Sequence, residues 1–340
     1  MENELRDLLN RPLRIGSKRI ENRLFLAPMA KLGNIAMREI ISSFGGCGLF
    51  FSEMVSSRSI PSAKGYELSG YRWNREELPS LVCQIYGNDP ATMARAACDI
   101  EKQGFFGVDI NFGCSAAAIC KRNCGAALLR DPLLSEKIVS AVRKAASIPL
   151  FVKFRAGWKN YAVPYTDLAR RFEDAGADAI TFHPRIAPDR RTRPARWEFI
   201  ARVREAVSIP LFGNGDVFEA SDCLRMIRTT GCDGVSLGRI AAAKPWVFSE
   251  WTESITASED IYRDCPLMLA ELLPCYFKEK SALRRFRLFS SYYATNFRFG
   301  HCLHTLMLRA QSMEAVKDSL TSFFETRPAI LSHPKTALFN

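Results

Sequence analysis

Three cysteines lie close together in the stretch DINFGCSAAAICKRNCGAALL, which covers residues 109–129. Cys114 ends an apolar run, and Cys120 and Cys124 precede an Ala- and Leu-rich segment. Such a group could bind a metal ion, close a disulfide, or contain one reactive thiol. Their spacing, C-x5-C-x3-C, lacks the C-x2-C pair typical of zinc sites, and the chain has only four histidines. We therefore expect no metal site. Whether these cysteines form a disulfide or include one reactive thiol has to be judged from the rest of the sequence.

Polar side chains also stand at the ends of other short apolar runs. Eight β-rich runs end in glycine, proline or polar residues: RLFLAPMA (23–30), GLFFSEMV (48–55), LVCQIYG (81–87), GVDINFGC (107–114), PLFVKFRAG (149–157), DAITFHPR (178–185), PLFGNGDV (210–217) and GVSLGRIA (234–241). The residues at their ends are Met29, Glu53, Gln84, Asn111 with Cys114, Lys153 with Arg155, His183 with Arg185, Asn214 with Asp216, and Arg239. Any one of these could be an ordinary solvated residue, but their recurrence at eight matching positions indicates a shared site.

The runs alternate with segments that carry apolar residues at three- and four-residue spacing. Examples are 89–104, 135–147, 165–177 and 219–231, which end near glycine or a small residue. Apolar strands flanked by amphipathic helices indicate a parallel sheet covered by helices. Eight such units predict an α/β fold of the (β/α)8 TIM-barrel type, in which the carboxyl ends of the strands face the active site. A doubly wound open sheet is the alternative.

Two of the strand ends suggest a phosphate site. GNGD (213–216) and LGR (237–239) offer glycine backbones that permit close approach and an arginine that can pair with an anion. They would follow the seventh and eighth strands, where barrels commonly bind phosphate. The chain has no G-x-G-x-x-G after its first strand and no G-x-x-x-x-G-K-[ST], so neither a Rossmann site nor a P-loop is indicated.

The size and charge of the chain limit its class and its partners. At 340 residues and 47% hydrophobic, it can bury a large core. It has no long uncharged apolar stretch, and its N-terminus lacks the order of a signal peptide, so we expect a cytoplasmic protein with reduced cysteines. A net charge of +11 favours a polyanionic partner, although a well-solvated basic surface would give the same value.

The strand pattern stops near residue 255, and the remainder reads as helical. We therefore expect a barrel domain over 1–253 and a separate all-helical domain over 254–340. Two segments could hold RNA: 184–205 contains seven arginines, and 277–300 interleaves Lys and Arg with Phe and Tyr. In the second segment the expected contacts are Arg284, Arg285 and Arg287, although some of its aromatic residues would serve only to pack the helix.

Taken together, these motifs resemble the tRNA-dihydrouridine synthase family. The resemblance rests on LAPMA (26–30), SEMV (52–55), QIYGNDPATMARAA (84–97), VDINFGC (108–114), GAALLRDP (125–132), VKFRAGW (152–158), GNGDV (213–217) and TGCDGVSLGRIAAAKPWVF (230–248). It runs in register from about residue 10 to 250, and the helical remainder fits the family's tRNA-binding domain. The resemblance implies bound FMN, NADPH (or NADH) as reductant, and conversion of a uridine in tRNA to 5,6-dihydrouridine.

The resemblance also implies roles for individual residues. The expected flavin contacts are Pro28, Met29, Ala30, Gln84, Lys153 and His183 at the ring, and Asn214, Gly215, Gly238 and Arg239 at the phosphate and ribitol, to which we add Asp216. The expected uracil contacts are Asn111 and Arg155, to which we add Glu53 and Arg185 from neighbouring strand ends.

The resemblance favours one working thiol among the three clustered cysteines. Reducing the C5=C6 bond of uracil needs a hydride at C6 and a proton at C5. Cys114 matches the family's proton donor, and a thiol with an ordinary pKa near 8.5 keeps its proton at neutral pH. Cys120 and Cys124 lie farther along the loop.

Two stretches differ from the usual family pattern. The family reads Gly-Cys-Pro, often with a lysine soon after, whereas this chain has Ser115 followed by three alanines. The family's His-Gly-Arg-Thr is here His183-Pro184-Arg185-Ile186.

Two alternative functions stay open: a flavin reductase acting on a small molecule, and a non-catalytic RNA-binding relative. We expect a monomer.

Overall fold

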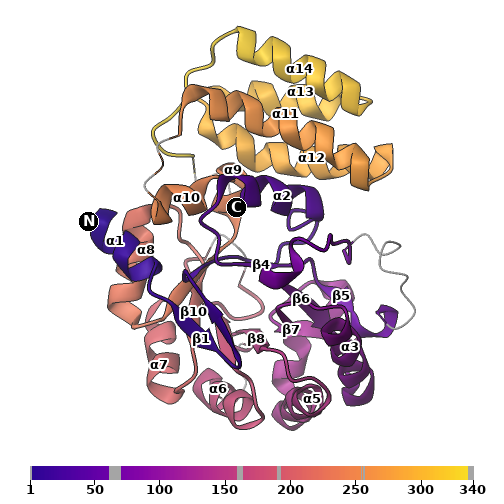
Figure 1. Ribbon diagram of the computed structural model, residues 1–340, viewed down its shortest axis with the longest axis vertical. Helices are drawn as coiled ribbons and strands as arrows, with labels where there is room; N and C mark the ends of the chain where they lie inside the picture. The colour runs from indigo at the N-terminus through magenta and orange to yellow at the C-terminus, as the bar shows by residue number, and fades with distance from the viewer. Residues whose placement is uncertain are drawn as a thin grey trace.

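The computed structural model describes residues 2–60, 70–158, 164–189, 193–253, 255 and 257–335. In Figure 1 a ring of strands surrounded by helices forms the lower part of the molecule, and a stack of helices lies above it. Of the Arg-rich segment 184–205, residues 190–192 lie outside the described part, as does residue 254 at the expected domain boundary.

Eight parallel strands in the described part of the chain close into a barrel. In chain order they are β3 (Leu24–Leu26), β4 (Leu49–Phe51), β6 (Leu81–Tyr86), β7 (Gly107–Phe112), β8 (Leu150–Arg155), β9 (Ala179–His183), β10 (Leu211–Asn214) and β11 (Gly234–Leu237). Each pairs with its neighbour along the chain, and β11 pairs with β3, so the sheet has no open edge. The TIM-barrel prediction is confirmed, and the doubly wound sheet is excluded. A short strand, β5 (Val55–Ser56), extends the pairing beside β6.

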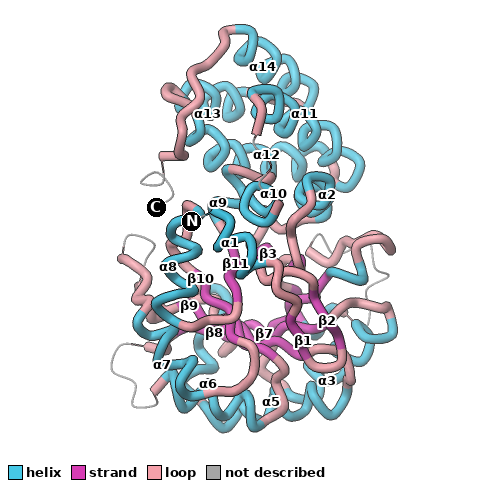
Figure 2. The backbone as a smooth tube through the Cα atoms, turned by 60° about the vertical axis from the view of Figure 1, so that its left-hand side comes forward, coloured by secondary structure: helices cyan, strands magenta, loops and turns pink. Residues whose placement is uncertain are grey.

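Helices cover the outside of the barrel, as Figure 2 shows. They are α2 (Ile35–Phe44), α3 (Pro90–Lys102), α5 (Pro132–Ala145), α6 (Tyr165–Asp174), α7 (Glu198–Ala206) and α8 (Ala220–Thr230). Two of them begin with the same Asp-Pro signal: Asp89 accepts a hydrogen bond from the Thr92 amide at 2.9 Å, and Asp131 from the Leu134 amide at 3.0 Å. An acidic N-cap followed by proline satisfies the free amides of the first turn and therefore fixes where each helix starts.

The amino end of the barrel is plugged by apolar side chains. Helix α1 (Glu2–Leu9) leads into a hairpin of β1 (Leu13–Ile15) and β2 (Lys18–Ile20). Ile15 and Ile20 of this hairpin join Phe25, Phe51 and Phe151 in one buried cluster, in which the ring centroids of Phe51 and Phe151 are 5.3 Å apart. Polar chemistry is therefore confined to the opposite, carboxyl end.

After β11, the chain forms two short helices and then a helical stack. The short ones are α9 (Arg239–Ala243) and α10 (Val247–Thr252), and the stack contains α11 (Glu259–Tyr276), α12 (Glu279–Tyr293), α13 (Gly300–Arg309) and α14 (Met313–Glu325). Trp246 packs edge-on against Tyr262 at 4.7 Å and Tyr293 at 6.4 Å between ring centroids. The stack therefore shares a continuous core with the barrel. No helix in the described ranges is long and apolar enough to cross a membrane.

Candidate active site

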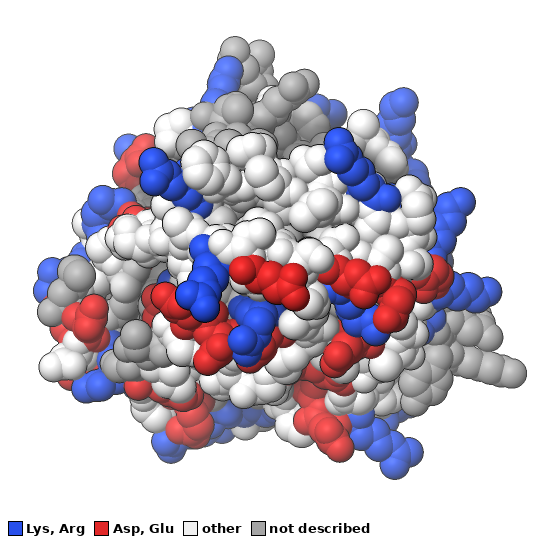
Figure 3. All heavy atoms as spheres, turned by 90° about the horizontal axis from the view of Figure 1, so that it is seen from above, with Lys and Arg blue, Asp and Glu red and all other residues white. Residues whose placement is uncertain are grey.

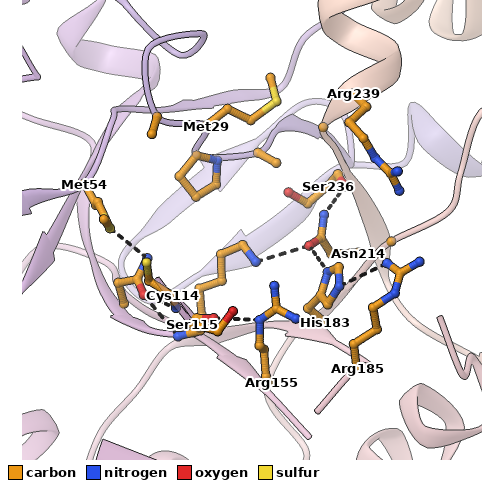
Figure 4. Close-up of a pocket in the computed structure, with 18 of the residues that line it drawn as sticks. Met29, Met54, Cys114, Ser115, Arg155, His183, Arg185, Asn214, Ser236 and Arg239 are labelled. Carbon is orange, nitrogen blue, oxygen red and sulfur yellow. Dashed lines mark hydrogen bonds between the residues drawn. The ribbon is translucent and has the colours of Figure 1, made fainter. Parts of the chain in front are cut away.

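A cavity of about 1030 Å³ opens at the carboxyl ends of the barrel strands (Figure 4). It is lined by every expected catalytic, cofactor and substrate residue except Glu53. These are Pro28, Met29, Ala30, Gln84, Asn111, Cys114, Lys153, Arg155, His183, Arg185, Asn214, Gly215, Asp216, Gly238 and Arg239. The barrel thus gathers side chains that the sequence distributes over more than two hundred positions.

The alternation of strand residues explains how the barrel does this. Side chains two apart on a strand point to the same face. On β8, Phe151 belongs to the buried plug, and Lys153 and Arg155 line the cavity above it. On β10, Phe212 belongs to the plug and Asn214 lines the cavity. On these two strands the apolar plug residue therefore indicates which later residues face the site.

Asn214 is the centre of a polar network in the cavity (Figure 4). Its Oδ1 accepts a hydrogen bond from Lys153 Nζ at 3.1 Å and lies 2.8 Å from His183 Nδ1, while its Nδ2 donates to the Ser236 carbonyl at 2.7 Å. Because that oxygen faces the imidazole, Nδ1 carries the hydrogen. Arg185 Nη1 lies 3.2 Å from the other ring nitrogen, and since arginine only donates, Nε2 accepts. The network therefore selects one neutral tautomer of His183.

The same surroundings shift two pKa values. Burial, assisted by the positive charges of Arg155 and Lys153, holds the pKa of His183 well below its usual value. Burial also lowers the pKa of Lys153 to about 8, with Arg155 acting in the same direction and Asp109 opposing it. The cavity consequently favours a neutral imidazole next to a lysine whose pKa is lowered.

Asp216 binds the two arginines at the rim of the cavity. It accepts from Arg185 Nη2 at 2.6 Å and from Arg239 Nη2 at 2.8 Å, and the Ala195 amide donates to it at 2.7 Å. Gly215, just before it, has a φ of 116°, a conformation that side chains disfavour. The GNGD turn thus holds a carboxylate that orients Arg239 rather than one that faces an anion directly.

Cys114 lies in a loop that is tied down on both sides. The Cys114 amide donates to Asn111 Oδ1 at 2.8 Å, and its carbonyl accepts from the Ala126 amide at 2.9 Å. A side chain at Gly125 would come within 2.6 Å of that carbonyl, which explains the glycine. Cys120, whose Sγ lies 3.5 Å from the Cys114 carbonyl, does not line the cavity. Burial raises the pKa of the Cys120 and Cys124 thiols.

The eleven cysteines, all in the described part of the chain, are free thiols. Within the same ranges, no group of three or more His, Cys, Asp or Glu side chains is arranged to hold a metal ion.

Comparison with known proteins places this site in a family. Residues 25–316 match the dihydrouridine synthase (Dus) family. The chain belongs to the dihydrouridine synthases. A probable tRNA-dihydrouridine synthase from Mycobacterium tuberculosis is 33% identical to it, over 96% of this chain and 87% of the relative. The tRNA-dihydrouridine synthase B of Pseudomonas aeruginosa is 36% identical, over 73% of this chain and 74% of the relative.

Solved structures support the fold of this dihydrouridine synthase. A 2-naphthoyl-CoA reductase complex superposes with a TM-score of 0.56 at 15% identity, covering 73% of this chain and 52% of the reductase chain. This similarity concerns the barrel architecture and is too distant in sequence to transfer a site.

Glu53, which was expected at the substrate, lies outside the cavity. Its Oε1 accepts from Arg285 Nη1 at 2.7 Å, and its Oε2 accepts from the Lys31 amide at 2.6 Å. Arg285 is only 5% exposed and also donates to the Lys31 carbonyl at 3.1 Å. This pair connects the barrel to α12. Arg285 is therefore removed from the expected RNA contacts, because it is buried and already bound to a carboxylate.

The other two arginines expected to bind RNA, Arg284 and Arg287, lie in different environments. Arg287 donates to the Met307 and Ala310 carbonyls at 3.3 and 2.6 Å, and so caps the carboxyl end of α13. Arg284 is exposed. Of the three arginines expected to bind RNA, Arg284 is exposed, Arg285 is buried, and Arg287 is half-buried with its guanidinium bound to two carbonyls.

Sequence reasoning missed several residues in and behind the site, among them Ser236. Leu288 and Tyr292 of α12 line the cavity, so the helical stack forms part of its wall. Asp109 lies fully buried on β7, two residues before Asn111. Its position in the run VDINF could have revealed it, because Asp109 and Asn111 point to the same face of the strand. No pattern in the sequence would have brought α12 to the cavity.

Proposed function

We propose that this chain reduces a uridine in tRNA to 5,6-dihydrouridine, using FMN and NADPH (or NADH). The observation that carries the proposal is a single cavity that combines one thiol, Cys114, with a half-buried lysine, Lys153, and an arginine, Arg239, at the end of β11. A thiol in that position suits proton donation to carbon, and the cationic groups suit an anionic cofactor. NADPH as reductant rests on family resemblance.

The fit of FMN can be judged from the cavity. Ser236 Oγ is buried and has no hydrogen-bond partner among the described residues, so a polar ligand atom would satisfy it. A side chain added at Gly238 would meet only Met29 Sδ, at 3.7 Å, so the backbone there is open to a ligand. The residues that would hold the ring are Pro28, Met29, Ala30, Gln84, Lys153 and His183, and those that would hold the ribityl phosphate are Asn214, Gly215, Gly238 and Arg239. When bound, the flavin supplies the hydride that adds to C6 of uracil.

The chain's own groups would complete the reduction. Cys114 would hold the proton that is delivered to C5. Asn111 would fix the thiol in place through its bond to the Cys114 amide, and Arg155, whose Nε donates to the Gly113 carbonyl at 2.6 Å, would support the same loop. Asp216 would act indirectly, by holding Arg239, since a carboxylate repels a phosphate.

A tRNA partner is supported by charge and by position. The face of the helical stack seen in Figure 3 shows acidic side chains among basic ones, and Asp260, Glu271, Glu314 and Asp318 of α11 and α14 are exposed. Such a mixed face attracts a polyanion poorly. The segment 298–309, by contrast, contains Arg298 and Arg309, both exposed, and no acidic residue. We therefore propose that RNA contacts Arg284, Arg298 and Arg309, and that the target base leaves its stack at a cost of a few kcal/mol.

Mass spectrometry of bulk tRNA from cells with and without this gene tests the proposal. A loss of dihydrouridine from the tRNA of the deletion strain, restored by a plasmid copy, is the expected result. Unchanged dihydrouridine would contradict it and would favour reduction of a small molecule in the same cavity.

A further inference from the structure

A line of buried hydrogen bonds runs from Asp109 to the Cys114 loop. Asp109 Oδ2 accepts from Gln84 Nε2 at 2.6 Å, and Gln84 Oε1 accepts from Asn111 Nδ2 at 2.8 Å. Asn111 Oδ1 then accepts from the amides of Gly113 and Cys114, at 3.0 and 2.8 Å. Three side chains from two neighbouring strands, β6 and β7, thus connect a buried carboxylate with the backbone of the loop that carries the thiol.

The direction of these bonds is set at both ends of the line. Burial raises the pKa of Asp109 to about 7, and above that pH the ionised carboxylate only accepts hydrogen bonds, so Gln84 has to turn its amide nitrogen toward Asp109. At the other end, the backbone amides of Gly113 and Cys114 can only donate, so Asn111 has to turn its oxygen toward them. The Gln84 oxygen then faces Asn111, which has to donate a hydrogen bond from its own amide nitrogen. The oxygen of Asn111 is left for the two loop amides. A reversal of either amide would set two NH groups, or two oxygens, against each other.

Burial makes this order strict. Asp109 is 0% and Gln84 1% exposed, so water does not compensate for a mismatched pair. The backbone of Gln84 is held separately, because its amide donates to Ser52 Oγ at 2.9 Å. Only the orientation of the side-chain amides is left to be decided, and the groups that cannot be reversed are the ionised Asp109 at one end and the two loop amides at the other.

We propose that Asp109 is a positioning residue for the reaction: through Gln84 it holds Asn111 in the one orientation that accepts from the Gly113 and Cys114 amides, and so keeps Cys114 at the cavity. The consequence for catalysis rests on the proposed function of Cys114. The positioning itself is a property of the protein without substrate and can be measured without one.

Hydrogen–deuterium exchange at single-residue resolution, on the purified protein without RNA or reductant, provides that measurement. In Asp109→Ala the amides of Gly113 and Cys114 should exchange about tenfold faster, since their acceptor is no longer held in one orientation. Gln84→Met, which keeps the side-chain volume but breaks the line at its middle, should accelerate the same two amides. Asp99→Ala, on the outer helix α3, is the matched control and should leave them unchanged.

A double variant separates orientation from mere filling of space. In Asp109→Asn with Gln84→Glu, the new asparagine donates to the new carboxylate, which accepts from Asn111 as before. The bond between residues 109 and 84 is reversed, but residue 84 still accepts from Asn111, so exchange at Gly113 and Cys114 should return to within about threefold of wild type.

Two results would overturn the positioning role. One is unchanged exchange at Gly113 and Cys114 in both Asp109→Ala and Gln84→Met. The other is a double variant that exchanges as fast as Asp109→Ala. Because no activity is read, these results are distinct from a failure of the uridine reductase proposal.

Discussion

Arg285 of helix α12 donates to Glu53 at the end of the second barrel strand, with 2.7 Å between Nη1 and Oε1 and with both side chains almost fully buried. Two segments more than two hundred residues apart are thereby joined beside the site. The helical stack is attached to the barrel through a specific ion pair as well as through apolar packing.

Removing one partner of this pair should be costly. Arg285→Ala leaves the Glu53 carboxylate buried without its cation, and we expect a loss of about 3–5 kcal/mol in the free energy of unfolding. Denaturant unfolding followed by circular dichroism measures this. The adjacent Arg284→Ala is a matched control, because its side chain is exposed and should change stability by less than about 0.5 kcal/mol. Equal stabilities of the two variants would refute the structural role of the pair.

For RNA binding the order should be reversed: Arg284, and not Arg285, should affect the affinity for tRNA. If Arg284 contacts one phosphate, Arg284→Ala should reduce the slope of log K against log salt by about 0.7 to 0.9. A tRNA titration at several salt concentrations, with the unfolding midpoint as a check on folding, measures that slope. A salt dependence parallel to that of wild type would mean that Arg284 is only a solvated surface residue.

Arg239 should govern flavin occupancy. Arg239→Ala removes a charged contact worth roughly 1.5–3 kcal/mol, so FMN affinity should fall by about 10- to 150-fold. Absorbance of the purified protein and titration with added FMN report this. Arg225→Ala is the control: Arg225 also lies near the GNGD turn, stacked on Trp197, but does not line the cavity. A colourless wild-type protein that fails to bind added FMN would end the flavoenzyme proposal.

His183 should make stability depend on pH. Its native pKa lies well below the usual value, so in mildly acidic solution the unfolded chain takes up a proton there and the native protein does not. Stability must then fall as the pH decreases below about 6.5, with a slope of at most about 1.4 kcal/mol per pH unit from this group.

Unfolding free energies between pH 7 and pH 5 test this dependence. His183→Gln should flatten the slope relative to wild type, whereas His301→Gln, at an exposed position, should not. A wild-type slope unaffected by His183→Gln would show that the imidazole is protonated in the native state.

The sequence was sufficient to predict the barrel and the polar strand-end residues of its cavity, because strand ends in a closed parallel barrel converge whatever their separation along the chain. Alternation along single strands explains why Lys153, His183 and Asn214 could be placed correctly. The positions of Arg285 and Glu53 depended instead on how the helical stack packs on the barrel, and no local pattern encodes that contact. Asp109 was missed for another reason: its place on the same strand face as Asn111 could be read from the run VDINF, but its bond to Gln84 on the neighbouring strand is visible only in the structure.

The most direct test of the central claim is mass spectrometric analysis of unmodified tRNA incubated with FMN-loaded protein and NADPH. Wild type should add two hydrogens to a uridine. Cys114→Ala should do so roughly 100- to 10,000-fold more slowly while still oxidising NADPH, because only the positioned acid is lost. Cys120→Ala, which alters a neighbouring thiol outside the cavity, should react at a rate close to wild type. Dihydrouridine formed equally fast by Cys114→Ala and wild type would contradict the role given to Cys114, and none formed by wild type would contradict the proposed function itself.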